Sequence, residues 1–189
     1  MKLPVPYYSQ FVDIQDPFWM LRACGGTCLK MVAEYHLPTG IPNREGIVVP
    51  DILSLCNEAK ERGGYDMQNG WVHDYLVNKA KELGLQAHRS EGLTNITDEI
   101  IASLDAGNPV IVSVEKRVLE QTRFHLIVIV GYEKEDNVSE LVDSFKLKSN
   151  SCFYYHESES TDKERGQYRT CDVETFMNYW RGKAIFISK

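Results

Sequence analysis

The 189-residue chain lacks the long apolar runs, basic stripes and paired cysteines that mark several large classes of protein. Its longest apolar run, Leu126 to Val130, has the length of a strand and is too short to cross a membrane. The formal net charge of −6 and the lack of clustered Lys and Arg argue against nucleic-acid binding. We therefore expect no membrane and no nucleic acid among its partners.

The cysteines are odd in number, and none of them forms a Cys-x-x-Cys pair, so a disulfide framework is not expected. A zinc site built from Cys24, Cys28 and His36 has a spacing that matches no structural zinc pattern. We expect no metal and no organic cofactor. The five cysteines stand at positions 24, 28, 56, 152 and 171.

The chain begins without the apolar segment of a secretory signal peptide, since Met1 is followed by Lys2, Leu3 and a Pro-Val-Pro run. The default expectation is a cytoplasmic protein, and a secreted one if Met1 starts a trimmed domain. The acidic net charge favours basic or neutral substrates. The sequence specifies no oligomeric state.

Apolar periodicity divides the chain near residue 108, with helical spacing before it and strand-like runs after it. We predict an α+β fold in one domain, 1–189, whose mainly helical part (1–108) packs on a mainly β part (109–189) with a cleft between them. Helices are predicted at 24–35, 51–62, 70–83, 96–104 and after 172. Strands are predicted at 109–114, 124–132, 139–143 and 184–187, with a long loop at 144–170.

Cys24 opens the run Cys24-Gly25-Gly26-Thr27-Cys28 at the start of the first predicted helix. Unpaired backbone N–H groups and the helix dipole favour negative charge at such a position, so a thiol there ionises more easily. A cysteine hydrolase would keep its nucleophile at this place. The competing interpretation is a small, half-buried residue beside a helix cap.

His125 stands at the head of the most apolar predicted strand, and Asp143 ends the strand predicted to follow it. If residues 133–137 form a hairpin turn, Asp143 faces Ile127, two residues from His125 on the same sheet face. Such diagonal neighbours lie about 7 to 8 Å apart, within reach of an Asp–His hydrogen bond. A carboxylate behind a histidine supports the imidazolium, which in turn stabilises a thiolate.

Gln10 precedes Cys24 by fourteen residues and follows the aromatic pair Tyr7-Tyr8. Its side-chain amide could donate to a developing oxyanion, together with the backbone N–H of Cys24. We also predict a substrate cleft that includes Trp19, Gly25, Trp71 and Phe124.

The order of short motifs resembles the bacteriocin-processing and double-glycine leader peptidase-like cysteine peptidases, which have a papain-like fold. The resemblance runs through Val5 to Gln10, Trp19, Ala23 to Thr27, Gly70-Trp71, Gly107 to Val112, His125 to Tyr132, Val142-Asp143 and Phe176 to Trp180. It implies a Cys24 nucleophile, a His125 general base and acid, an Asp143 that orients the imidazole, and a Gln10 oxyanion donor. It also implies a thiol hydrolase that cleaves a peptide or amide bond.

The chain departs from the family pattern at Gly26 and Ser144, where the family usually has proline. Two alternatives to hydrolysis therefore stay open. An acyltransferase or amidase would use the same triad and acyl-enzyme. A catalytically inactive binding module would retain the peptidase fold without a reactive thiol.

Overall fold

The computed structural model describes residues 1–38, 40–43, 46–92, 95–118, 121–133 and 151–189. Its helices are η1 (Trp19–Leu21), α1 (Cys24–His36), α2 (Ile52–Glu61), α3 (His73–Glu82), α4 (Ile96–Asp105), α5 (Lys163–Gly166) and α6 (Val173–Tyr179). Its strands are β1 (Tyr65–Asp66), β2 (Gly70–Trp71), β3 (Gln86–Glu91), β4 (Val110–Val118), β5 (Gln121–Glu133), β6 (Cys152–His156), β7 (Arg169–Asp172) and β8 (Trp180–Ser188).

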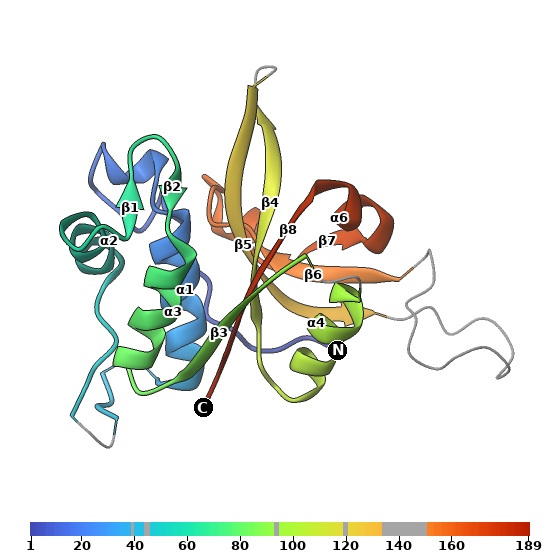
Figure 1. The fold of residues 1–189 in the computed structure, drawn as a ribbon, viewed down its shortest axis with the longest axis horizontal. Coiled ribbons are helices and arrows are strands. Elements are labelled where there is room, and N and C mark those ends of the chain that lie inside the picture. The colour runs from blue at the N-terminus through green and yellow to red at the C-terminus, as the bar shows by residue number, and fades with distance from the viewer. Residues whose placement is uncertain (39, 44–45, 93–94, 119–120, 134–150) are drawn as a thin grey trace, which may run out of the picture.

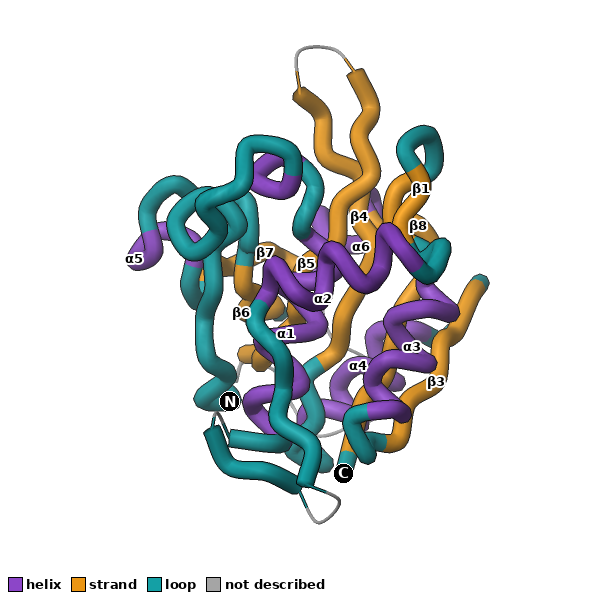
Figure 2. Tube along the Cα trace, turned by 90° about the vertical axis from the view of Figure 1, so that its left-hand side faces the viewer, coloured by secondary structure: helices purple, strands orange, loops and turns teal. Residues whose placement is uncertain are grey.

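Six strands form one antiparallel sheet in the order β3-β8-β4-β5-β6-β7. Helices α1, α2 and α3 lie on one side of this sheet, and α4 and α6 lie on the other side (Figure 1). Seen from the helical side, α1, α2 and α3 stand in front of the strands (Figure 2). The mixture of helices and antiparallel sheet confirms the predicted α+β class.

Helix α1 is the central helix, because nearly all of its residues are buried. The apolar stripe Cys28, Met31 and Val32 packs in the main core, as its spacing predicts. The opposite face is buried too, since Lys30 and Glu34 form an ion pair of 2.6 Å with side chains almost inaccessible to solvent. A helix that is covered on every side holds its N-terminal residue, Cys24, firmly in the interior.

Apolar side chains from α1, α4 and the central strands build the main core, and a smaller cluster lies beside the start of α1. None of the helices in the described part of the chain has the length and hydropathy of a membrane span. The smaller cluster consists of Ile14, Trp19, Ala23, Ile52 and Cys56, with Trp71 against it.

The predicted helices 24–35, 51–62 and 96–104 are confirmed to within a residue or two by α1, α2 and α4. The Asp51 side chain caps α2 by accepting a hydrogen bond from the N–H of Ser54. The helix predicted at 70–83 begins later, at His73, because Gly70-Trp71 pairs with Tyr65-Asp66 in a two-stranded ribbon. Gly70 has a φ of 79°, which a helix does not allow and which glycine adopts readily.

Three strands of the main sheet lie in segments where the sequence predicts none. In β3 only Ala87 is buried, so the strand has no apolar alternation that would mark it. Strands β6 and β7 lie within the predicted loop 144–170 or just past it, and they are short. Pairing with β8, β5 and each other stabilises these strands, and such long-range contacts leave little trace in local sequence.

The predicted strand 139–143 lies outside the described residues, and its pairing with β5 stays a prediction. Within the described residues, two positions of β5 have strand partners on both edges. Val128 pairs with Ile111 in β4 on one side and with His156 in β6 on the other. Ile129 likewise pairs with both strands. Asp143 itself lies outside the described residues.

Candidate active site

Cys24 is the first residue of α1, and its side chain lines a cleft of about 510 Å³ between the helices and the sheet. The residue is 9% exposed, so the thiol meets solvent through this cleft. His125 lines the same cleft from β5. The structure therefore brings together the two residues that the sequence predicts as nucleophile and base.

Two glycines after Cys24 allow an aromatic ring and a sulfur to pack against the first turn of α1. A Cβ on Gly25 would lie 2.3 Å from Cδ2 of Trp71, and a Cβ on Gly26 would lie 2.6 Å from Sγ of Cys56. Trp71 is fixed here because its Nε1–H donates a 2.7 Å hydrogen bond to the carbonyl of Arg22. Gly26 therefore has a packing role where the family pattern has proline.

His125 is held by an acid that the sequence analysis did not select. Its Nε2–H donates a 2.6 Å hydrogen bond to Oε1 of Glu157, and both side chains are more than nine-tenths buried. The other ring nitrogen, Nδ1, is buried without a hydrogen-bond partner among the described residues. Since Glu157 occupies Nε2, Nδ1 is the atom left to meet the Cys24 thiol.

The pKa values of this pair move in opposite directions. Burial lowers the pKa of His125, but its interactions with the Cys24 thiol and the Glu157 carboxylate outweigh burial and raise it to about 10. Burial raises the pKa of Glu157, but the hydrogen bond from His125 and the charges of His125 and Lys116 lower it to about 2. Each group thus favours the charged form of the other.

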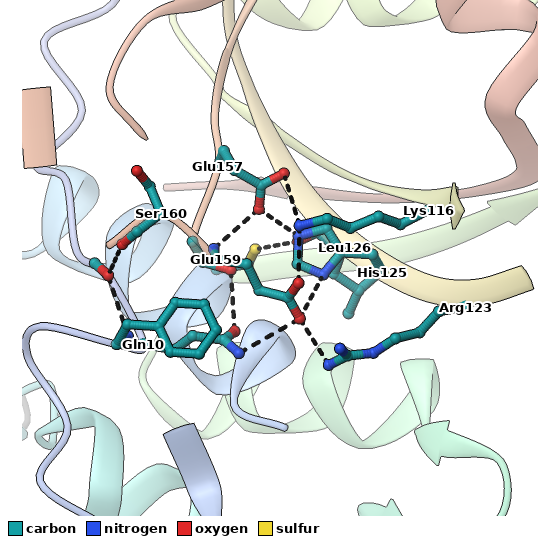
Figure 3. A network of polar contacts seen from close by, with 12 residues as sticks. Gln10, Lys116, Arg123, His125, Leu126, Glu157, Glu159 and Ser160 are labelled. Carbon is teal, nitrogen blue, oxygen red and sulfur yellow. Dashed lines mark hydrogen bonds and ion pairs between the residues drawn. The ribbon is translucent and has the colours of Figure 1, made fainter. Parts of the chain in front are cut away.

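A second acid with a buried side chain, Glu159, lies beside Glu157 and forms ion pairs with the neighbouring cations (Figure 3). Lys116 and Arg123 approach its carboxylate to 2.8 and 2.7 Å. Its backbone N–H donates to the same Oε1 of Glu157 that accepts from His125. One oxygen of Glu159 also lies 3.7 Å from Nδ1 of His125. This network orients Glu157 through main-chain and side-chain contacts.

Gln10 is fully buried behind this network rather than in the wall of the cleft. Its Nε2 donates a 2.8 Å hydrogen bond to the carbonyl of Met20 and lies 3.5 Å from Glu159. Its backbone N–H donates to the carbonyl of Ser158. The structure therefore brings Gln10 to the edge of the site, with its amide engaged by protein oxygens.

Glu157 carries a signal that sequence analysis could have used. The aromatic run Phe153-Tyr154-Tyr155 has the composition of a strand, and Glu157 follows that strand almost directly. An acid after the strand that pairs with the histidine strand was the argument that selected Asp143. Polar residues on either side hide β6 within an apparent loop, so Glu157 does not stand out in the sequence as an acid at a strand end.

Of the predicted substrate-binding residues, Trp71 and Phe124 line the cleft, and Trp19 and Gly25 do not. Trp19 is 2% exposed and belongs to the smaller core cluster, where its Nε1–H donates to Asn57. Gly25 is buried beneath Trp71. Phe124 is half exposed, and the guanidinium of Arg181 stacks on its ring at 3.3 Å.

The three residues considered for a zinc site do not converge. The Cys28 thiol donates to the carbonyl of Leu126, and His36 contacts the carbonyl of Ile187. Within the described ranges, no group of three or more His, Cys, Asp or Glu side chains is arranged to hold a metal ion.

Two solved structures resemble the chain over most of its length, and their low identities establish the fold alone. The peptidase domain of Streptococcus ComA, a bi-functional ABC transporter involved in a quorum sensing pathway, has a TM-score of 0.54 and 20% identity, covering 89% of this chain and 92% of that chain. A double glycine motif protease from an AMS/PCAT transporter, in complex with the leader peptide, has a TM-score of 0.55 and 14% identity, covering 100% of this chain and 94% of that chain.

The papain-like fold of these peptidase domains confirms the predicted architecture, with helices packed on an antiparallel sheet. No curated protein sequence matches the chain. A family model does match, and it spans nearly the whole sequence. Because residues 2–184 match the Peptidase_C39 like family, the protein belongs to that family and is a cysteine peptidase-like hydrolase.

Proposed function

We propose that the protein cleaves a peptide or amide bond through an acyl-thioester on Cys24, with His125 as general base and acid and Glu157 orienting the imidazole. The observation that carries this proposal is the buried hydrogen bond between Nε2 of His125 and Glu157, which leaves Nδ1 for the thiol. Glu157 takes the role that the sequence analysis assigned to Asp143.

In the proposed reaction, His125 accepts the proton of the Cys24 thiol, and the raised pKa of His125 favours the imidazolium that forms. The sulfur adds to the carbonyl carbon of the substrate. The C–N bond then breaks as His125 returns its proton to the leaving amine. Water, deprotonated by His125, adds to the thioester, and cleavage of the C–S bond releases the acid and regenerates the thiol.

Glu157 supports the imidazolium in this cycle by accepting the Nε2–H hydrogen bond throughout. Its lowered pKa keeps it ionised at every pH at which the enzyme would work. The backbone N–H of Cys24 is the proposed oxyanion donor. The Gln10 amide could join it only by leaving its contacts with Met20 and Glu159 and turning into the cleft.

A peptide is the favoured substrate class. One of the similar solved structures is a protease in complex with a leader peptide. The cleft is open and lined by both apolar and polar groups, which suits an extended chain. No metal or cofactor enters the proposed reaction.

Labelling with iodoacetamide tests the proposed pair without a known substrate. Each cysteine is followed by mass spectrometry across pH in the wild type and in His125→Ala and Glu157→Gln. We expect Cys24 to react near neutral pH roughly tenfold faster than an ordinary thiol, and to lose this advantage in His125→Ala. Free N-acetylcysteine in the same mixture serves as the ordinary-thiol reference, because burial and Asp172 raise the pKa of Cys171 to about 11.

A Cys24 that labels no faster than N-acetylcysteine, or whose rate does not change in His125→Ala, would contradict the proposal and favour a non-catalytic binding module. Once a substrate is found, Cys24→Ala should abolish its turnover. Product analysis with and without an added amine acceptor then separates hydrolysis from acyl transfer, since both pass through the same acyl-enzyme.

A further inference from the structure

The charge of the cleft is opposite to the charge of the chain. The protein has a formal net charge of −6, yet the described residues that line the cleft include three arginines and no aspartate or glutamate. The arginines come from different parts of the chain: Arg22 before α1, Arg123 in β5 and Arg181 in β8. The net charge of the chain therefore does not describe the charge of the cleft, and the cleft does not favour the basic substrates expected from the sequence.

Two of the three arginines form no ion pair with a carboxylate among the described residues. Arg123 is paired with Glu159 at 2.7 Å. Neither Arg22 nor Arg181 takes part in an ion pair within the described part of the chain. Arg22 donates from Nη1 to the carbonyl of Phe18, and Arg181 donates from Nη1 to the hydroxyl of Ser113. A guanidinium has five N–H donors, so each retains several for a ligand.

Arg181 is held in a fixed orientation, which favours binding by reducing the loss of side-chain freedom. Its guanidinium stacks on the Phe124 ring at 3.3 Å and is tied to Ser113 at 3.1 Å. A planar guanidinium that is fixed in this way can bind a carboxylate through two parallel hydrogen bonds.

Two titratable groups beside the cleft, His73 and Arg181, are shifted toward their neutral forms, mainly because they are buried. Burial, followed by the charges of Lys183, Arg89 and Arg181, lowers the pKa of His73 to about 4, against a smaller opposing effect of Glu91. Burial also lowers the pKa of Arg181, with only Glu115 acting in the opposite direction. The negative charge of an anion bound here would favour the protonated form of both groups.

We infer that the cleft binds a carboxylate of the peptide substrate through Arg181, with Arg22 as a second cation of the same cleft wall, near the scissile bond at Cys24. Apolar side chains flank this subsite, because Leu21, Met67 and Phe124 line the cleft and are at least half exposed. The substrate class is thus an acidic peptide with apolar neighbours. This inference rests on the proposed function for the position of the scissile bond.

Paired alkylating reagents test the inference at the nucleophile itself. Iodoacetate and iodoacetamide react with a thiol in the same way and differ in charge. We measure the ratio of their rates at Cys24, normalised to the ratio for N-acetylcysteine, at low salt. Arg181→Gln and Arg22→Gln should each lower this normalised ratio by roughly threefold to tenfold. Arg181→Lys keeps the positive charge and should therefore retain most of the wild-type ratio.

The control is Arg165→Gln, which removes one arginine that is 85% exposed and does not line the cleft. This variant should leave the ratio unchanged. Near-ultraviolet circular dichroism verifies that each variant folds, and Arg22→Gln provides an independent test if Arg181→Gln does not. A ratio that is unchanged in both cleft variants overturns the inference. A slow Cys24 with iodoacetamide overturns the proposed function instead, so the two failures are distinct.

Protection of Cys24 by peptides identifies the source of the carboxylate. The first comparison uses two short peptide aldehydes that are identical except that one carries Glu where the other carries Gln. The second comparison uses a peptide without Glu, once with a free C-terminal carboxylate and once with an amidated C-terminus. Stronger protection by the Glu aldehyde, lost in Arg181→Gln, assigns the subsite to an acidic side chain. Stronger protection by the free acid alone assigns it to a terminal carboxylate. Equal protection within both pairs overturns the inference.

Discussion

On the helical side of the cleft Cys24 is surrounded by two glycines, an indole ring and a buried thiol, whereas on the sheet side His125 is surrounded by charged groups. Steric fit positions the nucleophile, since Gly25 and Gly26 leave no room beneath Trp71 and Cys56. Ion pairs and hydrogen bonds position the base. Steric packing therefore positions one half of the site and electrostatic interactions position the other, and substitutions can distinguish the two contributions.

The largest effect should come from removing the acid on the sheet side. Glu157→Ala leaves His125 and the N–H of Glu159 without their shared acceptor, and breaking a buried pair in this way costs about 3 to 5 kcal/mol. Urea unfolding near neutral pH measures the loss, and the labelling rate of Cys24 should fall with it. Glu157→Gln retains an acceptor oxygen and should lose clearly less stability. A Glu157→Ala variant as stable as the wild type would show that the charge and hydrogen bond of Glu157 do not hold His125.

On the helical side, Gly25→Ala should destabilise the protein by about 1 to 3 kcal/mol through overpacking against Trp71. The change should also displace Cys24 and slow its labelling, although alanine is the better helix former. The double variant with Trp71→Ala should lose less than the sum of the single variants. Strict additivity would contradict a steric origin.

The pH dependence of stability should distinguish the two sides. Glu157 has a pKa lowered from 4.5 to about 2, so its stabilisation is present above pH 4.5 and is lost as the pH falls through 2. His125 has a pKa raised from 6.5 to about 10, so its stabilisation is complete below pH 6.5 and is lost as the pH rises through 10. The destabilisation by Glu157→Gln should therefore be greatest between pH 4.5 and 6.5. The destabilisation caused by Gly25→Ala should be the same at every pH in this range. A pH-dependent destabilisation by Gly25→Ala would contradict a steric origin on the helical side.

The smallest effect is expected at Gly26. Its Cβ would meet only the sulfur of Cys56 at 2.6 Å and a more distant edge of Trp71. Gly26→Ala and Cys56→Ala should each destabilise the protein, the first by crowding and the second by leaving a cavity. Combined, they should recover about 1 kcal/mol of coupling free energy in a double-mutant cycle. A coupling near zero would mean that the first turn of α1 adjusts without Cys56.

Local patterns in the sequence were sufficient to predict the helices and strands that bury one continuous apolar face. The start of α1 at Cys24 and the strand that carries His125 both follow from runs of apolar residues with a regular period. The order of short motifs along the chain was sufficient to identify the family. These features depend on neighbours along the chain, which the sequence displays directly.

The partner of His125 and the walls of the cleft depend on residues far apart in the chain. Glu157 is 32 residues from His125, and only the pairing of β5 with β6 brings them together. The burial of Trp19 also depends on residues distant in the sequence, because its ring packs in the small core cluster and its Nε1–H donates to Asn57. A strand as short as β6 acquires its stability from the sheet, so its own residues predict it weakly.

The sequence by itself determined the α+β class, the helix start at Cys24 and the strand of His125, because each follows from hydrophobic periodicity and local backbone preference. Only the tertiary structure decided that Glu157 is the acid beside His125, that Gln10 lies behind the cleft wall, and that three arginines gather in an acidic protein. Those outcomes depend on strand register and on which side chains meet in space, and a one-dimensional pattern does not encode distances between segments.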